Sequence, residues 1–363
     1  MGIYDQLDSP SLLVNPGIVR RNIAEMVRMT GNVERLRPHI KTHKTAEGIR
    51  MMLDAGITKF KCATIAEAEL LALQGAPDVL LAHQPVRPRI ERLQQLILAY
   101  PHTQFSTITD HLDAAKQIGD VFDKHAQSIG VYIDINVGMN RTGIAPDETA
   151  LALYEGLMHM KGIHFMGLHV YDGQHRQADP AARETACDEA FQAVYGLIDM
   201  MASKGYPRPF IIAGGSPSFS IHAKRMDRDC SPGTNIFWDR GYGLICPEQE
   251  FEPAVHILTR VISLPASNRI CLDLGHKAVA SENELAKRVY FPEHPELKAV
   301  GQSEEHLVME LAPGHGFKPG DTLIGIPYHI CPTVALHETL VAVEGEKVVG
   351  EWKVEARKRK ISC

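Results

Sequence analysis

Basic side chains are crowded into one short segment near the start of the chain. Two histidines and two lysines follow an apolar run in the octet Arg37-Pro38-His39-Ile40-Lys41-Thr42-His43-Lys44. A lysine held beside other cations at the end of a buried strand has a lowered pKa, because desolvation and like charge both disfavour the ammonium. Such an amine can form a Schiff base. Lys41 is our candidate, and the alternative is a solvated basic turn that leads into a helix starting near Thr45.

Glycine and hydroxyl residues after other apolar runs could hold an anion. The segment Ala213-Gly214-Gly215-Ser216-Pro217-Ser218 offers backbone N–H groups and the Ser216 hydroxyl. The segment Ser231-Pro232-Gly233-Thr234 offers a second set of donors for the same phosphate. Many such glycine segments are only turns, and that interpretation stays open. A Schiff-base lysine together with a phosphate site suggests pyridoxal 5′-phosphate (PLP) as the cofactor.

A second group of candidate ligands lies near the C-terminus, in Tyr328-His329-Ile330-Cys331-Pro332-Thr333. In an extended segment, residues i and i+2 point the same way, so the His329 imidazole and the Cys331 thiolate could bind one cation. Two ligands leave positions for water or substrate, as a catalytic metal requires. The alternative is that Cys331 is an inert buried thiol.

Composition narrows the class of protein. The chain has 363 residues, of which 44% are hydrophobic and 23% charged, and a formal net charge of −6 with scattered basic residues. Nothing suggests a nucleic-acid surface, which would need a clustered basic face. No apolar run approaches the about 20 residues that span a bilayer, and the N-terminus lacks a secretory pattern. We therefore expect a cytoplasmic protein that acts on a small molecule.

Short apolar, β-branched runs alternate with helical patterns from about residue 12 to about residue 245. The strand-like runs cover residues 11–14, 36–41, 59–64, 79–83, 105–109, 131–135, 162–169 and 210–213. Such alternation indicates βαβ units and a parallel sheet. Roughly eight units favour an α/β fold with a closed (β/α)8, TIM-type barrel, whose active site lies at the C-terminal strand ends. After Cys246, short β patterns split by Gly and Pro turns predict an antiparallel β domain.

As an ordered set, these motifs resemble the D-threonine aldolase and D-serine dehydratase family, which are metal-assisted members of the alanine-racemase-like (fold-type III) PLP enzymes. The resemblance runs over nearly the whole chain. It is carried by the octet 37–44, by the run from Asp134 to Gly143, and by the segments 214–217, 231–234, 303–306 and 329–333.

The resemblance implies a role for each candidate residue. Residues 12–245 would form a PLP-binding barrel similar to the alanine racemase N-terminal domain, and residues 246–363 with about 1–11 a metal-binding β domain. Lys41 would form the Schiff base with PLP. The other implied residues are Gly215, Ser216, Gly233 and Thr234 at the phosphate, Arg141 near the phenolic oxygen, His169 or Tyr171 near the ring, and His329 with Cys331 as ligands of Mn²⁺, Zn²⁺ or Mg²⁺. Family members are typically homodimers, with the site between one subunit's barrel and the other's β domain.

We expect the substrate to be a D-3-hydroxy amino acid whose hydroxyl binds the metal. Retro-aldol cleavage of D-threonine type would give glycine and an aldehyde. Dehydration of D-serine or D-3-hydroxyaspartate, giving a 2-oxo acid and ammonia, is the alternative. Lys41, once freed, or His169 would be the general base. A His-x-Cys pair is common among the dehydratases of this family, whereas the motifs as a whole are closer to the aldolases, which we favour.

Two other functions stay open at this point. An amino-acid racemase on the same fold would need a second base, usually a tyrosine from the β domain, and Tyr328 directly precedes His329. A racemase has no use for a pair of metal-binding residues such as His329 and Cys331. A non-catalytic PLP carrier would have only the barrel, and the long β region after Cys246 counts against it.

Overall fold

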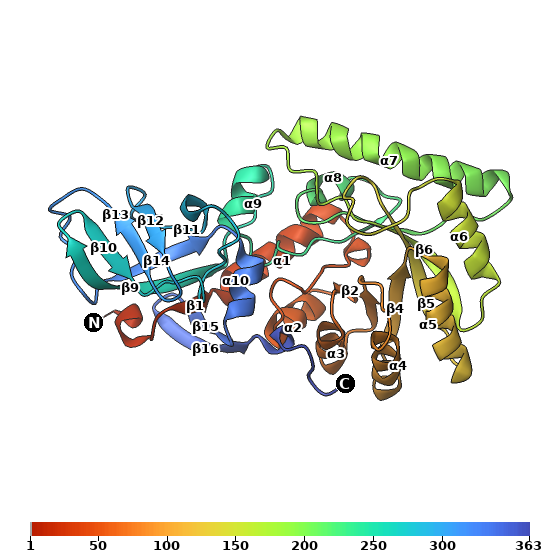
Figure 1. Cartoon of the computed structure of the whole chain (residues 1–363), viewed down its shortest axis with the longest axis horizontal. Coiled ribbons are helices and arrows are strands. Elements are labelled where there is room, and N and C mark those ends of the chain that lie inside the picture. The colour runs from red at the N-terminus through yellow and green to blue at the C-terminus, as the bar shows by residue number, and fades with distance from the viewer. Residues whose placement is uncertain (1) are drawn as a thin grey trace.

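A parallel sheet forms the first part of the molecule. The computed structural model describes residues 2–363 (Figure 1). Seven parallel strands are hydrogen-bonded in their order along the chain. They are β2 (Lys59–Cys62), β3 (Asp78–Leu81), β4 (Gln104–Thr109), β5 (Ile129–Ile135), β6 (Ile163–Val170), β7 (Ile211–Ala213) and β8 (Asp229–Cys230).

Helices connect these strands and lie around the sheet (Figure 1). Local sequence sets their ends, as α1 (Pro16–Thr30) shows: the Asn15 side chain accepts a hydrogen bond from the Ile18 N–H, and Pro16 takes the first helical position. The others are α2 (Ala46–Asp54), α3 (Ile65–Leu73), α4 (Arg89–Ala99), α5 (Leu112–Lys124), α6 (Glu148–Met158), α7 (Pro180–Ser203), α8 (Phe219–His222) and α9 (Arg240–Ile245).

The segment 36–40 joins the two edges of the parallel sheet. On one side the Arg37 N–H donates to the Cys230 carbonyl (2.9 Å). On the other side the Ile40 N–H donates to the Lys61 carbonyl (3.0 Å), and the Lys61 N–H donates to the Pro38 carbonyl (2.9 Å). This segment takes the place of an eighth strand, so the predicted α/β barrel fold is confirmed. Lys41 directly follows it.

The second sheet is mixed and mostly antiparallel. It contains β1 (Ser11–Val14), β9 (Val255–Ala266), β10 (Arg269–Leu272), β11 (Val289–Tyr290), β12 (Lys298–Gln302), β13 (Leu307–Glu310), β14 (Thr322–Pro327), β15 (Thr339–Glu344) and β16 (Lys347–Lys353). The sequence pattern placed residues 11–14 in the barrel, and this placement is wrong. β1 instead pairs with β15 in parallel and with β9 in antiparallel register.

The barrel and the second sheet share one hydrophobic core. Buried side chains of both parts belong to a single cluster, and the rings of Phe237 and Trp352 lie 6.3 Å apart across the boundary. The N-terminal segment also contacts the second sheet, because the Arg260 guanidinium on β9 donates to the carbonyls of Tyr4 and Leu7 (both 2.6 Å). Within residues 2–363, no helix is both long and apolar enough to cross a membrane.

Candidate active site in the barrel cavity

The predicted cofactor residues line one cavity at the C-terminal ends of the barrel strands. Its volume is about 570 Å³. All eight predicted residues are in its wall: Lys41, Arg141, His169, Tyr171, Gly215, Ser216, Gly233 and Thr234. The wall also contains His39, Lys61 and Asp134. Cations outnumber carboxylates here, so the cavity suits an anionic ligand.

The basic octet separates into two groups in the structure. Lys41 and His39 face the cavity, and burial together with the charges of Lys41, Lys61 and Lys44 holds the pKa of His39 well below its usual value. Lys44 instead forms a salt bridge with the buried Glu67 outside the cavity wall. His43 is buried, and its Nδ1 lies 3.1 Å from the Thr45 hydroxyl at the start of α2. Of the two lysines, only Lys41 can therefore meet a ligand in the cavity.

Two glycine-containing loops, which the sequence predicts to bind an anion, contact each other close to Tyr171. The Ser216 Oγ accepts hydrogen bonds from the backbone N–H groups of Gly233 (3.2 Å) and Thr234 (2.9 Å). A Cβ on Gly215 would lie 2.8 Å from Cε2 of Tyr171. The missing side chain thus lets the aromatic ring and the backbone donors approach each other closely. Backbone N–H groups and hydroxyls are the donors that a phosphate needs.

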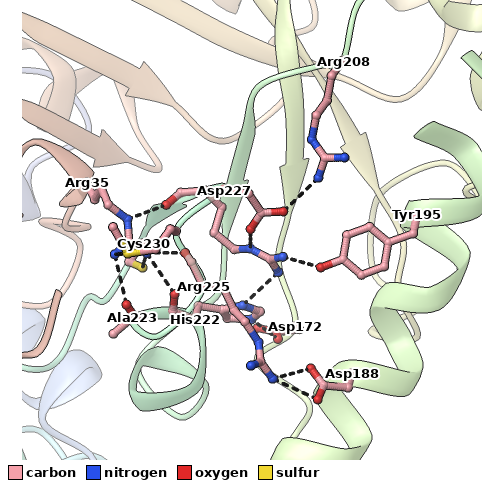
Figure 2. Close-up of polar contacts among 12 residues, drawn as sticks. Arg35, Asp172, Asp188, Tyr195, Arg208, His222, Ala223, Arg225, Asp227 and Cys230 are labelled. Atoms are coloured by element: carbon pink, nitrogen blue, oxygen red, sulfur yellow. Dashed lines mark hydrogen bonds and ion pairs between the residues drawn. The ribbon is translucent and has the colours of Figure 1, made fainter. Parts of the chain in front are cut away.

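A buried network supports the first of these loops, and Figure 2 shows two of its residues, Asp172 and His222. The Gly215 N–H donates to Ser218 Oγ (3.2 Å), and the Ser218 hydroxyl donates to Asp172 Oδ1 (2.5 Å). The His222 Nε2–H donates to Asp172 Oδ2 (2.6 Å). Burial acts to raise the pKa of Asp172, but the interactions with His222 and Ser218 outweigh burial and lower it. Asp172 is therefore a charged anchor for the loop.

The residue types in this network are also those of a metal site. Donor atoms of Asp172, Cys187 and His222 lie within 4.8 Å of one another, and all three residues are buried. However, both Asp172 oxygens already accept hydrogen bonds, and Arg228 Nη1 lies 3.4 Å from Nδ1 of His222. A guanidinium is always charged and repels a second cation. We interpret the cluster as a hydrogen-bonded network that holds the loop in place.

A second chain of polar contacts crosses the cavity floor. The His169 Nδ1–H donates to Asp134 Oδ1 (2.7 Å), and His169 Nε2 lies 3.5 Å from Lys61 Nζ. Burial acts to raise the pKa of Asp134, but the hydrogen bond and charge of His169, with smaller contributions from Thr142 and Lys61, together outweigh burial and lower it. The Arg141 guanidinium lies 5.1 Å from the centre of the Tyr171 ring. The charged Asp134 thus fixes the orientation of His169.

The proposed metal ligands lie next to the barrel site, at the start of a helix. We predicted an extended segment for residues 328–333, and this prediction is wrong, because α10 (Ile330–Leu336) begins directly after His329. Asp239 explains the difference: it caps α9 by accepting from the Tyr242 N–H (2.8 Å) and also accepts from the Ile330 N–H (3.0 Å). Pro332 is tolerated because it lies in the first turn.

The two side chains nevertheless meet. Burial opposes ionisation of the Cys331 thiol, but the hydrogen bond from His329 and the charge of Lys41 lower its pKa. The pKa of His329 is raised to about 9, since its contacts with Cys331 and Glu282 outweigh burial. The Nδ1 of His329 contacts Glu282, which leaves Nε2 available. A thiolate and an imidazole nitrogen can bind a divalent cation.

Sequence reasoning missed four residues of this site: Lys61, Asp134, Asp172 and Glu282. Asp134 and Asp172 stand at or just after strand ends beside predicted residues, so their positions were a usable signal. Lys61 alternates with the buried Phe60 and Cys62 in β2, which predicts only that it faces the other side of the strand. Nothing near Glu282 in the sequence indicates its contact with His329.

Comparison with known proteins agrees with this fold. The family model of the alanine racemase N-terminal domain matches residues 14–240, and that of the putative serine dehydratase domain matches residues 254–343. A D-threonine aldolase of Arthrobacter sp is 27% identical over 97% of this chain and 93% of its own length. A D-threo-3-hydroxyaspartate dehydratase of Delftia sp. (strain HT23) is 25% identical over 96% of this chain and 97% of its own. The crystal structure of a D-threonine aldolase from Filomicrobium marinum is 25% identical, covers 97% of this chain and 96% of that one, and has a TM-score of 0.90.

Proposed function

The chain belongs to the family of the alanine racemase N-terminal domain, and we propose that it is a PLP- and divalent-metal-dependent lyase that cleaves D-3-hydroxy amino acids to glycine and an aldehyde. One observation carries the proposal. The eight residues that the sequence predicts to bind PLP line one cavity, and Cys331 contacts Thr234 in the wall of that cavity. Relatives named as aldolases and dehydratases match over almost their whole length. The reaction class, a lyase, is common to all of them.

The residues present fit PLP. The Lys41 amine would attach the cofactor, and the N–H groups and hydroxyls around Gly215, Ser216, Gly233 and Thr234 would hold its phosphate. Arg141 and Tyr171, which contact each other, would lie at the ring and its phenolic oxygen. Bound PLP acts as an electron sink for a carbanion on the amino-acid substrate.

His329 and Cys331 would hold the divalent cation, with water or the substrate hydroxyl in its remaining positions. Glu282 would keep His329 oriented through Nδ1, as carboxylates commonly do for histidine ligands. A bound Mn²⁺, Zn²⁺ or Mg²⁺ supplies a Lewis acid that stabilises an alkoxide on the substrate. The Thr234 hydroxyl lies 3.5 Å from Cys331 Sγ, so the cation would be close to the phosphate loops.

Proton transfer would use the chain's own bases. Because Asp134 holds the Nδ1–H of His169, the neutral imidazole keeps its lone pair on Nε2, and His169 is in the cavity wall. Nε2 can take the proton of the substrate hydroxyl when the Cα–Cβ bond breaks. The Lys41 amine, once released by the substrate, is a second group that can carry a proton.

A dehydratase is the second candidate, and Cys331 is the observation that favours it. Thiolate is a soft ligand that suits Zn²⁺. A cation that binds the substrate hydroxyl can also help it to leave as hydroxide while a base takes the Cα proton. The products would then be a 2-oxo acid and ammonia.

Incubation with D-threonine and with D-serine, each with PLP and Mn²⁺ or Zn²⁺, tests the proposal. Glycine and acetaldehyde from D-threonine support the aldolase, and 2-oxo acid without glycine supports the dehydratase. Absence of both products with either metal contradicts the lyase. Lys41→Ala should also lose the visible absorption band of the bound cofactor, whereas Lys44→Ala, the matched control, should keep it.

Three finer points are part of the same proposal. The barrel would extend from α1 to residue 245 as a functional unit, and the N-terminal segment through β1 would form the metal-binding domain together with residues 246–363. Two copies of the chain would work as a homodimer in the cytoplasm. A mass of about twice the 40.2 kDa of one chain in light scattering would support the dimer.

A further inference from the structure

Lys61 is a buried lysine without an acidic partner. Its side chain is 2% exposed in the middle of β2. Two residues earlier on the same strand, Lys59 Nζ lies 2.5 Å from Asp229 Oδ2. Within residues 2–363, by contrast, no carboxylate oxygen lies within 4 Å of Lys61 Nζ. Burying an unpaired ammonium is costly, so such a residue requires an explanation.

Among residues 2–363, one polar atom lies within hydrogen-bond distance of the Lys61 amine. This atom belongs to His169. Lys61 Nζ lies 3.5 Å from Nε2 of His169, and the opposite ring nitrogen donates to Asp134 (2.7 Å). A neutral imidazole with its proton on Nδ1 can only accept at Nε2. Asp134, His169 and Lys61 therefore form a line of carboxylate, imidazole and amine along the cavity floor.

We propose that Lys61 and His169 hold one proton between Nζ and Nε2, which makes Lys61 a positioning residue that keeps the His169 imidazole neutral. In one state Lys61 is an ammonium and Nε2 accepts its hydrogen bond. In the other, the proton has moved to Nε2, leaving a neutral amine and an imidazolium. The Nδ1–H stays on Asp134 in both states, so the total charge of the pair is unchanged.

The charges around the pair favour the first state. Burial and the charge of Lys41 lower the pKa of Lys61 to about 7, with Arg37 acting in the same direction, while Asp134 and Asp172 act against it. Burial also lowers the pKa of His169; Asp134 opposes this shift, and Lys61 and Arg141 add to it. His39, the other titratable group in this wall, has its pKa held low as well. Lys61 and His169 thus titrate as a coupled pair, with the shared proton mainly on Lys61.

This pair adds a proton-transfer role to the proposed function. The catalytic use of the pair rests on that proposed function. A lyase of this kind must remove a proton from the substrate and return one to the product. A neutral imidazole beside an ammonium supplies an acceptor and a donor on adjacent side chains. Lys61 would act through His169: the hydrogen bond from Lys61 to Nε2 would give way to the substrate, so that Nε2 can take the substrate proton, and the imidazolium would return that proton to the product.

The test is to follow His169 directly in the apoprotein labelled with ¹⁵N-histidine. Long-range ¹H–¹⁵N spectra report the tautomer and protonation of each imidazole, and His169→Gln assigns the signal. We compare the unaltered chain with Lys61→Met, which removes the charge, and with Lys61→Arg, which keeps it. Lys116→Met, an exposed site on α5, is the control for loss of a lysine elsewhere.

In the unaltered chain, we expect His169 to be a neutral Nδ1–H tautomer throughout the neutral pH range. Lys61→Met should raise the pH at which His169 becomes protonated by about one unit or more, because a like charge has been removed. Lys61→Arg and Lys116→Met should leave His169 as it was. An unshifted midpoint in Lys61→Met, or an Nε2–H tautomer in the unaltered chain, would overturn the proposal.

Should Lys61→Met fail to fold, Lys61→Gln gives the same comparison with a polar side chain. The measurement needs neither cofactor nor turnover. A chain without lyase activity can still show the shared proton, and an active lyase can lack it. Failure of the proposed function is therefore distinguishable from failure of this inference.

Discussion

The hydroxyl oxygen of Thr42 lies 3.0 Å from Sγ of Cys331, although 289 positions separate the two residues in the chain. Thr42 is the neighbour of Lys41, the proposed PLP anchor. The contact is made within a single chain, so the His329–Cys331 pair reaches the barrel site without a second copy. The proposed cofactor and cation therefore belong to one site.

Different residues would hold the metal and PLP, which predicts that the two can be removed separately. A chelator, or Cys331→Ala, should abolish lyase activity, because the substrate hydroxyl loses its Lewis acid. The visible band of bound PLP should remain, since neither Lys41 nor the phosphate loops change. Metal analysis, absorbance and product assays measure the three effects on one sample. Full activity of metal-depleted protein would rule out the metal mechanism. Cys271→Ala, at a buried thiol of the second sheet, is the control.

The close approach of Tyr171 to the first phosphate loop predicts that Gly215→Ala weakens PLP binding. The new Cβ would lie 2.8 Å from Cε2 of Tyr171, so the ring or the loop must move. We expect at least a tenfold loss of PLP affinity, about 1.4 kcal/mol, measured by fluorescence titration. Gly196→Ala is the control, because a Cβ there meets nothing within 4 Å. Because Gly196 lies in the middle of α7, Gly196→Ala should stabilise the fold by about 0.5–1 kcal/mol. Equal PLP affinity in both variants would contradict the steric argument.

The network beneath the same loop predicts a different outcome for Asp172→Asn. Loss of the buried charge weakens the hydrogen bonds from His222 and Ser218, and we expect a destabilisation of about 2 kcal/mol. PLP affinity should also fall, because Ser218 no longer fixes the Gly215 N–H. Chemical denaturation and cofactor titration measure the two effects. Asp188→Asn removes a half-exposed partner of Arg225 and should change stability by less than about 1 kcal/mol. Addition of Zn²⁺ should not stabilise the unaltered network, and a clear stabilisation that Asp172→Asn abolishes would show it to be a metal site instead.

The buried charge of Lys61 predicts a gain in stability when it is removed. Lys61→Met should stabilise the apoprotein at neutral or lower pH by about 1–4 kcal/mol, because an unpaired buried ion is replaced by an apolar side chain. The pKa of Lys61 falls from 10.5 to about 7 on folding, so between these values the unfolded chain binds more protons and stability rises with pH. The advantage of Lys61→Met is therefore largest below about pH 7 and disappears as the pH rises towards 10.5. Urea denaturation of both proteins across this range tests the window, and a constant difference would refute it.

Much of the barrel was predictable, because alternating strand and helix patterns follow from local sequence. The placement of Ser11–Val14 was not, since a four-residue apolar run carries no information about its partners. The helix after His329 was missed for a related reason: Asp239, which caps its first N–H, lies 91 positions away. The residues that line the cavity were predictable wherever they end strands or form glycine loops. Lys61 was not, because its burial depends on the curvature of the whole sheet.

The pairing of β1 also has a consequence for the order in which the protein can fold during synthesis. Leu12 is among the first residues made, yet it pairs with Ile257 and Leu340. The ribosome must therefore complete nearly the whole chain before β1 has both neighbours, whereas the parallel strands can pair as they emerge. We expect nascent chains that stop after the barrel to expose an apolar N-terminal strand. Such chains should be targets for chaperones until the last hairpin, β15 with β16, is released.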